Sequence, residues 1–240
     1  PYGSPGAGFD PEDPTRWIGL RCQWKVNLED GTATPVSVLQ KEGGHLGGSV
    51  PTQRNYRFRH QDGRTFLIGM GMLNILSELM PDGSLRDLAA YSSCHHFCYA
   101  THWNPPREFT AAFEKSFPEL KGKHAEKGRG VLWVDRNGDE ELQIEEFSFT
   151  AEHFGGSRWG FFQNDLTLRA PAKRGDSWAI CTIEPDGFLP NGVPNYPELD
   201  EAAKAAVIVK PPREADFRSL GVSTAVDRFD HVVFNSTPYM

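Results

Sequence analysis

Turn-forming residues recur so often along this chain that few segments between them are long enough for an extended helix. Glycine (24) and proline (18) take up about one position in six of the 240 residues, and both interrupt regular structure. Phenylalanine (16), tryptophan (6) and tyrosine (6) are frequent, and aromatic side chains are favoured in strands. The sequence therefore predicts an all-β fold of many short strands joined by turns.

Two Asp-Gly pairs between apolar runs are the strongest local signals, because Asp-Gly suits the tight turn of a β-hairpin. The pairs Asp62-Gly63 and Asp82-Gly83 each separate two predicted strands: Tyr56–His60 from Thr65–Gly69, and Leu73–Met80 from Leu85–Tyr91. The leucines of Leu73–Leu79 also recur at helical spacing, which leaves a helix as the alternative there.

The rest of the chain shows further strand patterns and one polar interruption. The segment Cys94–Gly130 contains Pro105-Pro106, and we expect it to be a long insertion (94–130) with one short helix at Glu108–Phe117. A helical turn is expected at Leu199–Ala206. Strands are predicted at Trp17–Leu28, Pro35–Lys41, Gly130–Val134, Glu145–Thr150, Trp159–Phe162, Leu166–Ala170, Ser177–Glu184, Val222–Val226 and His231–Asn235.

The strands follow one another as hairpins over the whole chain, several with acidic turns. This order favours a β-propeller over a β-sandwich, because a sandwich needs the long crossovers of Greek keys. We therefore expect residues 1–240 to form a single portion of a propeller.

Charge and hydropathy exclude several classes of partner. The net charge is −7 and no basic block stands out, so nucleic acid and anionic membrane surfaces are poor candidate partners. No stretch approaches about 18 consecutive apolar residues, so we expect no membrane span. The chain begins with Pro1 and not Met, so we expect an upstream portion that would hold any export signal.

The acidic segment 135–146, DRNGDEELQIEE, carries the clearest chemical signal. Oxygen-bearing side chains stand at positions 1, 3 and 5 of a twelve-residue loop, and a carboxylate closes it at position 12. This is the spacing of an EF-hand loop, which surrounds calcium with oxygen ligands. The sequence predicts a calcium site formed by Asp135, Asn137, Asp139, the backbone carbonyl of Glu141, and Glu146.

One position departs from the EF-hand pattern. Position 6 is normally glycine, for a sharp turn, and here it is Glu140. The loop also follows a strand-like segment, so the two helices that flank the loop of an EF-hand would be absent here. A solvated acidic turn is the alternative, and a structural role for the ion is favoured over calcium sensing.

Several segments resemble a family of large, secreted, NHL-like β-propeller proteins of planctomycetes and related polysaccharide-degrading bacteria. The resemblance rests on two long stretches, Tyr2–Leu28 and Leu132–Phe147, within which Asp10–Pro14, Cys22–Lys25 and Trp133–Asp139 match the family pattern in order. A later segment, Asn191–Tyr196, resembles the family as well. The resemblance implies a secreted or periplasmic location. It also implies that the chain supplies about three to four blades, with another chain or a missing segment completing the ring.

Other residues give weaker signals. The four cysteines (Cys22, Cys94, Cys98, Cys181) permit disulfides in an oxidising compartment, and the cluster CHHFC at 94–98 with His102 leaves zinc open as an alternative. Some propeller polysaccharide lyases abstract a sugar proton with His or Tyr, and the candidates for such a base here are His45, His95 and His96. Exposed aromatic rings could stack on sugars, and the candidates are Trp103, Trp159 and Tyr196.

These observations favour a calcium-stabilised propeller module that binds a ligand or a partner subunit, plausibly a carbohydrate. A polysaccharide lyase or glycoside-cleaving enzyme is the first alternative. A purely structural subunit of a larger assembly is the second.

Overall fold

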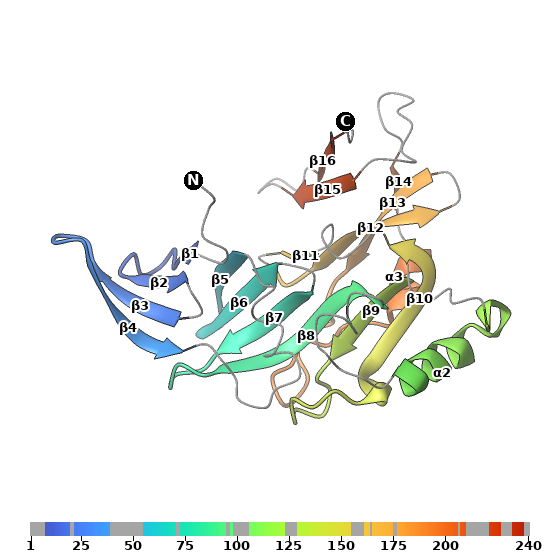
Figure 1. The fold of residues 1–240 in the computed structure, drawn as a ribbon, viewed down its shortest axis with the longest axis horizontal. Helices are drawn as coiled ribbons and strands as arrows, with labels where there is room; N and C mark the ends of the chain where they lie inside the picture. The colour runs from blue at the N-terminus through green and yellow to red at the C-terminus, as the bar shows by residue number, and fades with distance from the viewer. Residues whose placement is uncertain are drawn as a thin grey trace.

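Antiparallel sheets dominate the computed structural model, which confirms the all-β prediction (Figure 1). The structure describes residues 8–19, 22–38, 55–70, 73–94, 97, 106–122, 129–154, 161–163, 165–174, 177–205, 207–209, 221–226 and 232–237. A small sheet near the N-terminus contains β1 (Gly8–Phe9), β2 (Arg16–Gly19), β3 (Cys22–Asn27) and β4 (Thr32–Val38).

A ten-stranded sheet forms the body of the molecule. Its strands are hydrogen-bonded in the order β14-β13-β12-β10-β9-β8-β7-β6-β5, with β11 pairing with β12. A separate pair is formed by β15 (Gly221–Val226) and β16 (Val232–Thr237). The strands of the large sheet are β5 (Asn55–Gln61), β6 (Arg64–Met70), β7 (Asn74–Leu79), β8 (Leu85–Ser93), β9 (Arg129–Val134), β10 (Phe147–Phe154), β11 (Phe161–Phe162), β12 (Leu168–Arg174), β13 (Ser177–Ile183) and β14 (Val207–Val209).

Both Asp-Gly hairpins are confirmed. Strands β5 and β6 pair from Gln61 and Arg64 outward, and the two residues between them have left-handed backbones, with φ of 52° at Asp62 and 74° at Gly63. Positive φ at both central positions matches the right-handed twist of the strands that the turn joins. The second hairpin joins β7 to β8, so the segment that begins at Leu73 is a strand and not a helix.

The prediction of a single strand over Trp17–Leu28 is wrong. The chain reverses within this segment, because Gly19 pairs with Cys22 and Trp17 pairs with Trp24 across β2 and β3. Gly19 makes this possible, since a Cβ atom there would lie 2.4 Å from the ring of Trp17. The indole of Trp24 then donates a hydrogen bond to the carbonyl of Gly19 at 2.9 Å.

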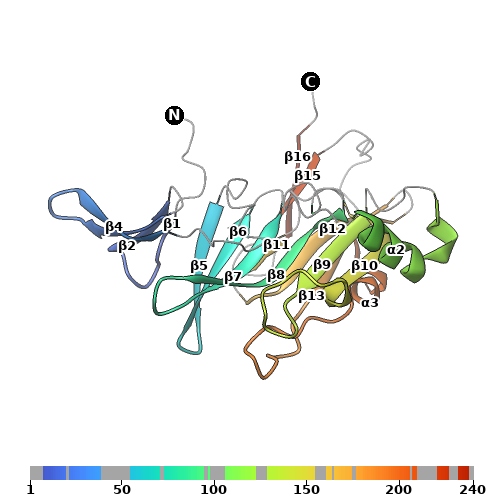
Figure 2. The same ribbon diagram turned by 60° about the horizontal axis from the view of Figure 1, so that its bottom comes forward.

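The large sheet is buried on both faces, because successive residues of a strand point to opposite sides. Val131 and Trp133 of β9 belong to the core on one face, and Leu132 and Val134 belong to the core on the other. Helices α2 (Pro106–Ser116) and α3 (Leu199–Lys204) lie on either side of β10 (Figure 2).

The predicted helix of the 94–130 insertion is present as α2, and it is part of the core. Phe109 lies 5.0 Å from Phe149 and 5.6 Å from Phe147, ring centre to ring centre, both with edge-to-face geometry. Phe113 contacts Phe149 in the same way at 5.9 Å. Helix α2 therefore packs against one face of the sheet as part of its core.

The propeller prediction is met only at the coarser level of an all-β fold. Propeller blades are four-stranded sheets arranged around an axis. Within the described residues, neither a closed ring nor a blade arrangement is seen. No helix in the described part of the chain is long and apolar enough to cross a membrane.

Candidate metal centre

The acidic loop connects two central strands of the large sheet, β9 and β10. Its first residue, Asp135, is fixed by its backbone N–H, which donates to the carbonyl of Leu88 on β8 at 3.0 Å. Leu142 at position 8 is buried in the core on the α2 side. A short 3-10 helix, η4 (Ile144–Glu146), carries the loop into β10. The loop is therefore held at both ends and in its middle.

Three of the five predicted ligands lie together. Asp135, Asp139 and Glu146 each offer a carboxylate oxygen, and these oxygens all lie within 4.8 Å of one another. Oxygens bound to one calcium ion at 2.3–2.6 Å can be at most about 5 Å apart. The cluster is therefore compact enough for a single ion of that size.

Asp135 has one carboxylate oxygen occupied and one available. Its Oδ1 accepts hydrogen bonds from the backbone N–H groups of Gly138 at 2.9 Å and Glu140 at 3.2 Å. Its Oδ2 is buried and, within the described residues, accepts no hydrogen bond. The cation nearest to Oδ2 is the Arg86 guanidinium on β8, with Nη2 at 3.7 Å. A buried carboxylate oxygen without a hydrogen bond is costly, and a bound cation would remove that cost.

Glu146 is held from the core side. The indole Nε1 of the fully buried Trp133 donates to its Oε2 at 3.0 Å, and the backbone N–H of Asn137 donates to its Oε1 at 3.3 Å. Glu146 itself is 5% exposed. These contacts fix the orientation of the carboxylate at the position that closes an EF-hand loop.

Burial shifts the pKa values of both buried carboxyls of the loop, Asp135 and Glu146, upward. Burial raises the pKa of Asp135, against hydrogen bonds from Glu140 and Gly138 that lower it. Burial likewise raises the pKa of Glu146, and the neighbouring charges of Asp135 and Asp139 raise it further. A divalent cation among the three would favour their charged forms.

The other two predicted ligands, Asn137 and Glu141, are both hydrogen-bonded to Asp139. The Asn137 amide donates to Oδ2 of Asp139 at 2.9 Å, and its Oδ1 accepts the backbone N–H of Asp139. The backbone N–H of Glu141 donates to Oδ1 of Asp139 at 2.8 Å. Sequence reasoning missed Gln143, whose side-chain amide also donates to Oδ2 of Asp139. Its place at position 9, where EF-hand loops often bind through water, was the signal available.

Glu140 performs the turn that glycine makes in an EF-hand loop. Its φ is 62°, in the left-handed region that disfavours residues with a side chain. The side chain is engaged as well, since Oε2 accepts the backbone N–H of Asp87 at 3.2 Å. The departure from the glycine pattern therefore leaves the bend of the loop in place.

Among the other residues that the sequence singled out, one prediction is wrong. Tyr196 is wrong as an exposed sugar-stacking ring, because it is 1% exposed and its hydroxyl donates to the carbonyl of Leu166 at 2.5 Å. Cys94 is buried beneath α2. The other candidates lie outside the described residues: His45, His95, His96, Cys98, His102, Trp103 and Trp159.

Comparisons with known proteins do not extend these findings. No protein-family model, no curated protein and no solved structure gives a significant match to the chain. The resemblance to secreted NHL-like proteins therefore stays a prediction from the sequence.

Proposed function

We propose that this chain is an exported, calcium-stabilised β-sheet module that binds a ligand or a partner subunit. The observation that carries the calcium part is the compact group of carboxylate oxygens of Asp135, Asp139 and Glu146. Within the described residues, Oδ2 of the buried Asp135 accepts no hydrogen bond. All the candidate ligands are oxygens, and hard cations such as calcium prefer oxygen ligands.

The ion would act structurally. The loop joins β9 to β10, and its closing residue Glu146 is bonded to Trp133 in the core. Calcium would neutralise the charge that burial disfavours and would join the two ends of the loop. Sites in extracellular modules fill at about 10⁻⁴–10⁻³ M calcium, so a secreted or periplasmic location fits a structural site of modest affinity.

Calorimetry of calcium binding to the full chain, stripped of metal with EDTA, tests this function. We expect a calcium-dependent heat and a rise in melting temperature, both reduced by Asp135→Asn and by Asp139→Asn. Glu141→Gln is the matched control: it removes the same charge from the same loop, but only the backbone of Glu141 is a proposed ligand. No heat in the parent chain, or an equal loss in Glu141→Gln, would refute the site.

A partner chain would add to the open edges of the large sheet. Strands β5 and β14 end the hydrogen-bonded order, and edge strands offer unpaired backbone groups to a further strand. The expectation of three or four propeller blades remains a prediction, which the unbroken pairing from β5 to β14 does not support. Native mass spectrometry of the intact sample would identify a completing chain, and a monomer at all concentrations would exclude one.

A further inference from the structure

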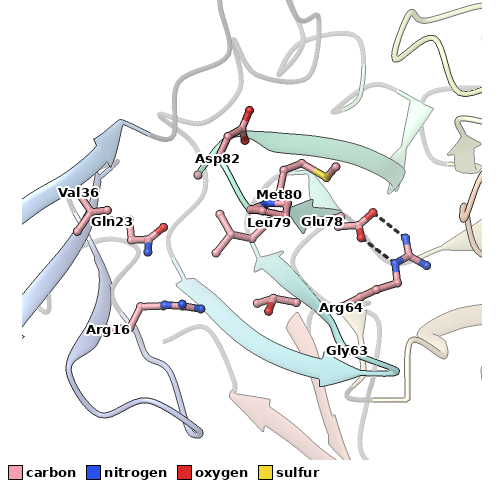
Figure 3. A pocket seen from close by; sticks show the side chains of 12 residues that line it. Arg16, Gln23, Val36, Gly63, Arg64, Glu78, Leu79, Met80 and Asp82 are labelled. Carbon is pink, nitrogen blue, oxygen red and sulfur yellow. Dashed lines mark hydrogen bonds and ion pairs between the residues drawn. The ribbon is translucent and has the colours of Figure 1, made fainter.

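A cleft separates the small sheet from the large one. It lies between β2–β4 on one side and the β5–β6 and β7–β8 hairpins on the other, and its volume is about 470 Å³ (Figure 3). Ligand pockets commonly have volumes of about 300–1,000 Å³. The side chains of Arg16 and Gln23 reach into the cleft from the small sheet, opposite Leu79 of β7.

Gln23 is the polar group that the protein leaves unsatisfied there. It is 9% exposed, and its Oε1 is buried without a hydrogen-bond partner in the described part of the chain. Buried polar groups are almost always paired, so an unpaired one at the wall of a cleft indicates a ligand group that pairs with it.

A second set of polar groups is held in place by Asp10. The carboxylate of Asp10, 1% exposed, bonds to Nη1 of Arg16 at 3.2 Å and to Nε2 of His60 at 2.6 Å. A carboxylate only accepts, so Nε2 carries the proton and Nδ1 of a neutral ring accepts from Thr65 Oγ1 at 3.1 Å. Thr65 also lines the cleft.

The charges of the cleft are already matched. Arg16 is paired with Asp10, and Arg64 donates to both oxygens of Glu78 at 2.7 and 2.6 Å. The exposed Asp82 adds a negative charge at the rim. Among the described residues that line the cleft, both arginines are paired with carboxylates, so these residues favour a neutral ligand over an anionic one. Apolar groups complete the wall, namely those of Val36, Leu79, Met80 and Pro81.

We propose that this cleft binds a neutral saccharide of one or two rings, with Gln23, Thr65 and Arg16 bonding its hydroxyls. The amide oxygen of Gln23 and the hydroxyl oxygen of Thr65 need a donor, and the guanidinium of Arg16 needs an acceptor. A sugar hydroxyl can act as either. The C–H faces of a sugar ring fit the apolar wall. The proposal rests on the ligand-binding part of the proposed function and does not depend on the calcium loop.

The arrangement suits binding better than catalysis. Both ring nitrogens of His60 are hydrogen-bonded, one to Asp10 and one to Thr65, so neither is available to accept a substrate proton. Asp10 holds the side chains of Arg16 and His60 in place and is therefore a positioning residue.

The test is calorimetric titration of the full chain with cellobiose, maltose, xylobiose and N,N′-diacetylchitobiose, and with digalacturonate as the anionic comparison. We expect at least one neutral disaccharide to bind and digalacturonate to bind more weakly. Gln23→Met removes the amide at similar size and should lower the affinity about tenfold. Lys25→Ala, at an exposed position of the same strand, should leave the affinity unchanged.

Stability provides the second measurement. An unpaired buried amide is costly, so Gln23→Met should unfold at the same temperature as the parent or higher, while its calcium heat is unchanged. A destabilised Gln23→Met, unchanged saccharide affinity in that variant, no binding by any neutral disaccharide, or equal binding of digalacturonate would overturn the proposal. Loss of calcium binding alone would count against the metal site and not against the cleft.

Discussion

The indole Nε1 of Trp133 donates a hydrogen bond to Oε2 of Glu146 across 3.0 Å, and both side chains are buried. Trp133 is the fifth residue of β9, and Glu146 is the last residue before β10. This bond joins the closing carboxylate of the acidic loop to the core that packs beneath α2. The acidic loop and the sheet should therefore change stability together.

Removing the indole donor should destabilise the chain. In Trp133→Phe the ring remains apolar, but Oε2 of Glu146 loses its only side-chain donor in the described structure. We expect a loss of about 1–3 kcal/mol in the free energy of unfolding, measured with urea in EDTA. Trp17→Phe is the control, because the indole nitrogen of Trp17 makes no hydrogen bond within the described residues. Equal losses in the two variants would show that ring size, and not the hydrogen bond, matters.

The metal-free chain should lose stability as the pH rises through the raised pKa values of Asp135 and Glu146. Burial raises both pKa values above their ordinary 3.8 and 4.5, so the folded state holds these protons more tightly than the unfolded chain. The stability from this source is complete below the ordinary values and disappears above the raised ones.

This pH dependence is measured as a difference, because other carboxyls such as Asp13 have lowered pKa values and act in the opposite sense. The stability of the parent minus that of Asp135→Asn should fall with rising pH in EDTA. Excess calcium should reverse the trend, since it binds the charged carboxylates. Parallel curves for the two proteins in EDTA would contradict the assignment.

Two substitutions at Glu140 separate backbone strain from side-chain contact. Glu140→Ala and Glu140→Gly both remove the acceptor of the Asp87 N–H, but only glycine tolerates the φ of 62° without strain. We expect the glycine variant to be more stable than the alanine variant by about 1 kcal/mol, and to bind calcium more tightly. The two variants are compared by thermal unfolding with and without calcium. A more stable alanine variant would mean that the left-handed backbone is absent in solution.

Arg64 should not be replaceable by lysine. Its guanidinium binds Glu78 through two nitrogens and lies 4.7 Å and 5.1 Å from the ring centres of Phe66 and Phe188. A lysine keeps the charge but loses the two-point bond and the stacking, so Arg64→Lys should cost about 1–2 kcal/mol in chemical denaturation. Lys204→Ala breaks an exposed ion pair and should change stability little. Similar effects in the two variants would argue against the buried pair.

The strands that could be predicted from the sequence were those joined by a turn with a recognisable Asp-Gly pair. Asp62-Gly63 and Asp82-Gly83 specify tight hairpins within a few residues, and both hairpins formed as expected. The reversal after Gly19 carried no such dipeptide, and it depends on the Trp17 ring lying against a residue without a Cβ atom. That contact is made between strands, so the linear pattern of Trp17–Leu28 did not reveal it.

The spacing of the acidic loop likewise identified the three carboxylates that come together, because a twelve-residue loop is a local unit. It did not reveal the support from Trp133 or the nearby charge of Arg86, which belong to β9 and β8. The cleft had no local signal at all. Gln23, Thr65 and Asp10 are far apart in the chain and meet only where the two sheets face each other.

The sequence by itself determined what short segments decide: the β class, the hairpins at Asp-Gly turns, the helix at Pro106–Ser116 and the grouping of the loop's carboxylates. These depend on backbone preferences and on spacings of a few residues. Only the tertiary structure decided that Asp135 and Glu146 are buried, that Tyr196 is a core residue, and that Gln23 faces a cleft. Burial depends on which distant strands pack together, and it is burial that leaves a carboxylate and an amide in need of partners.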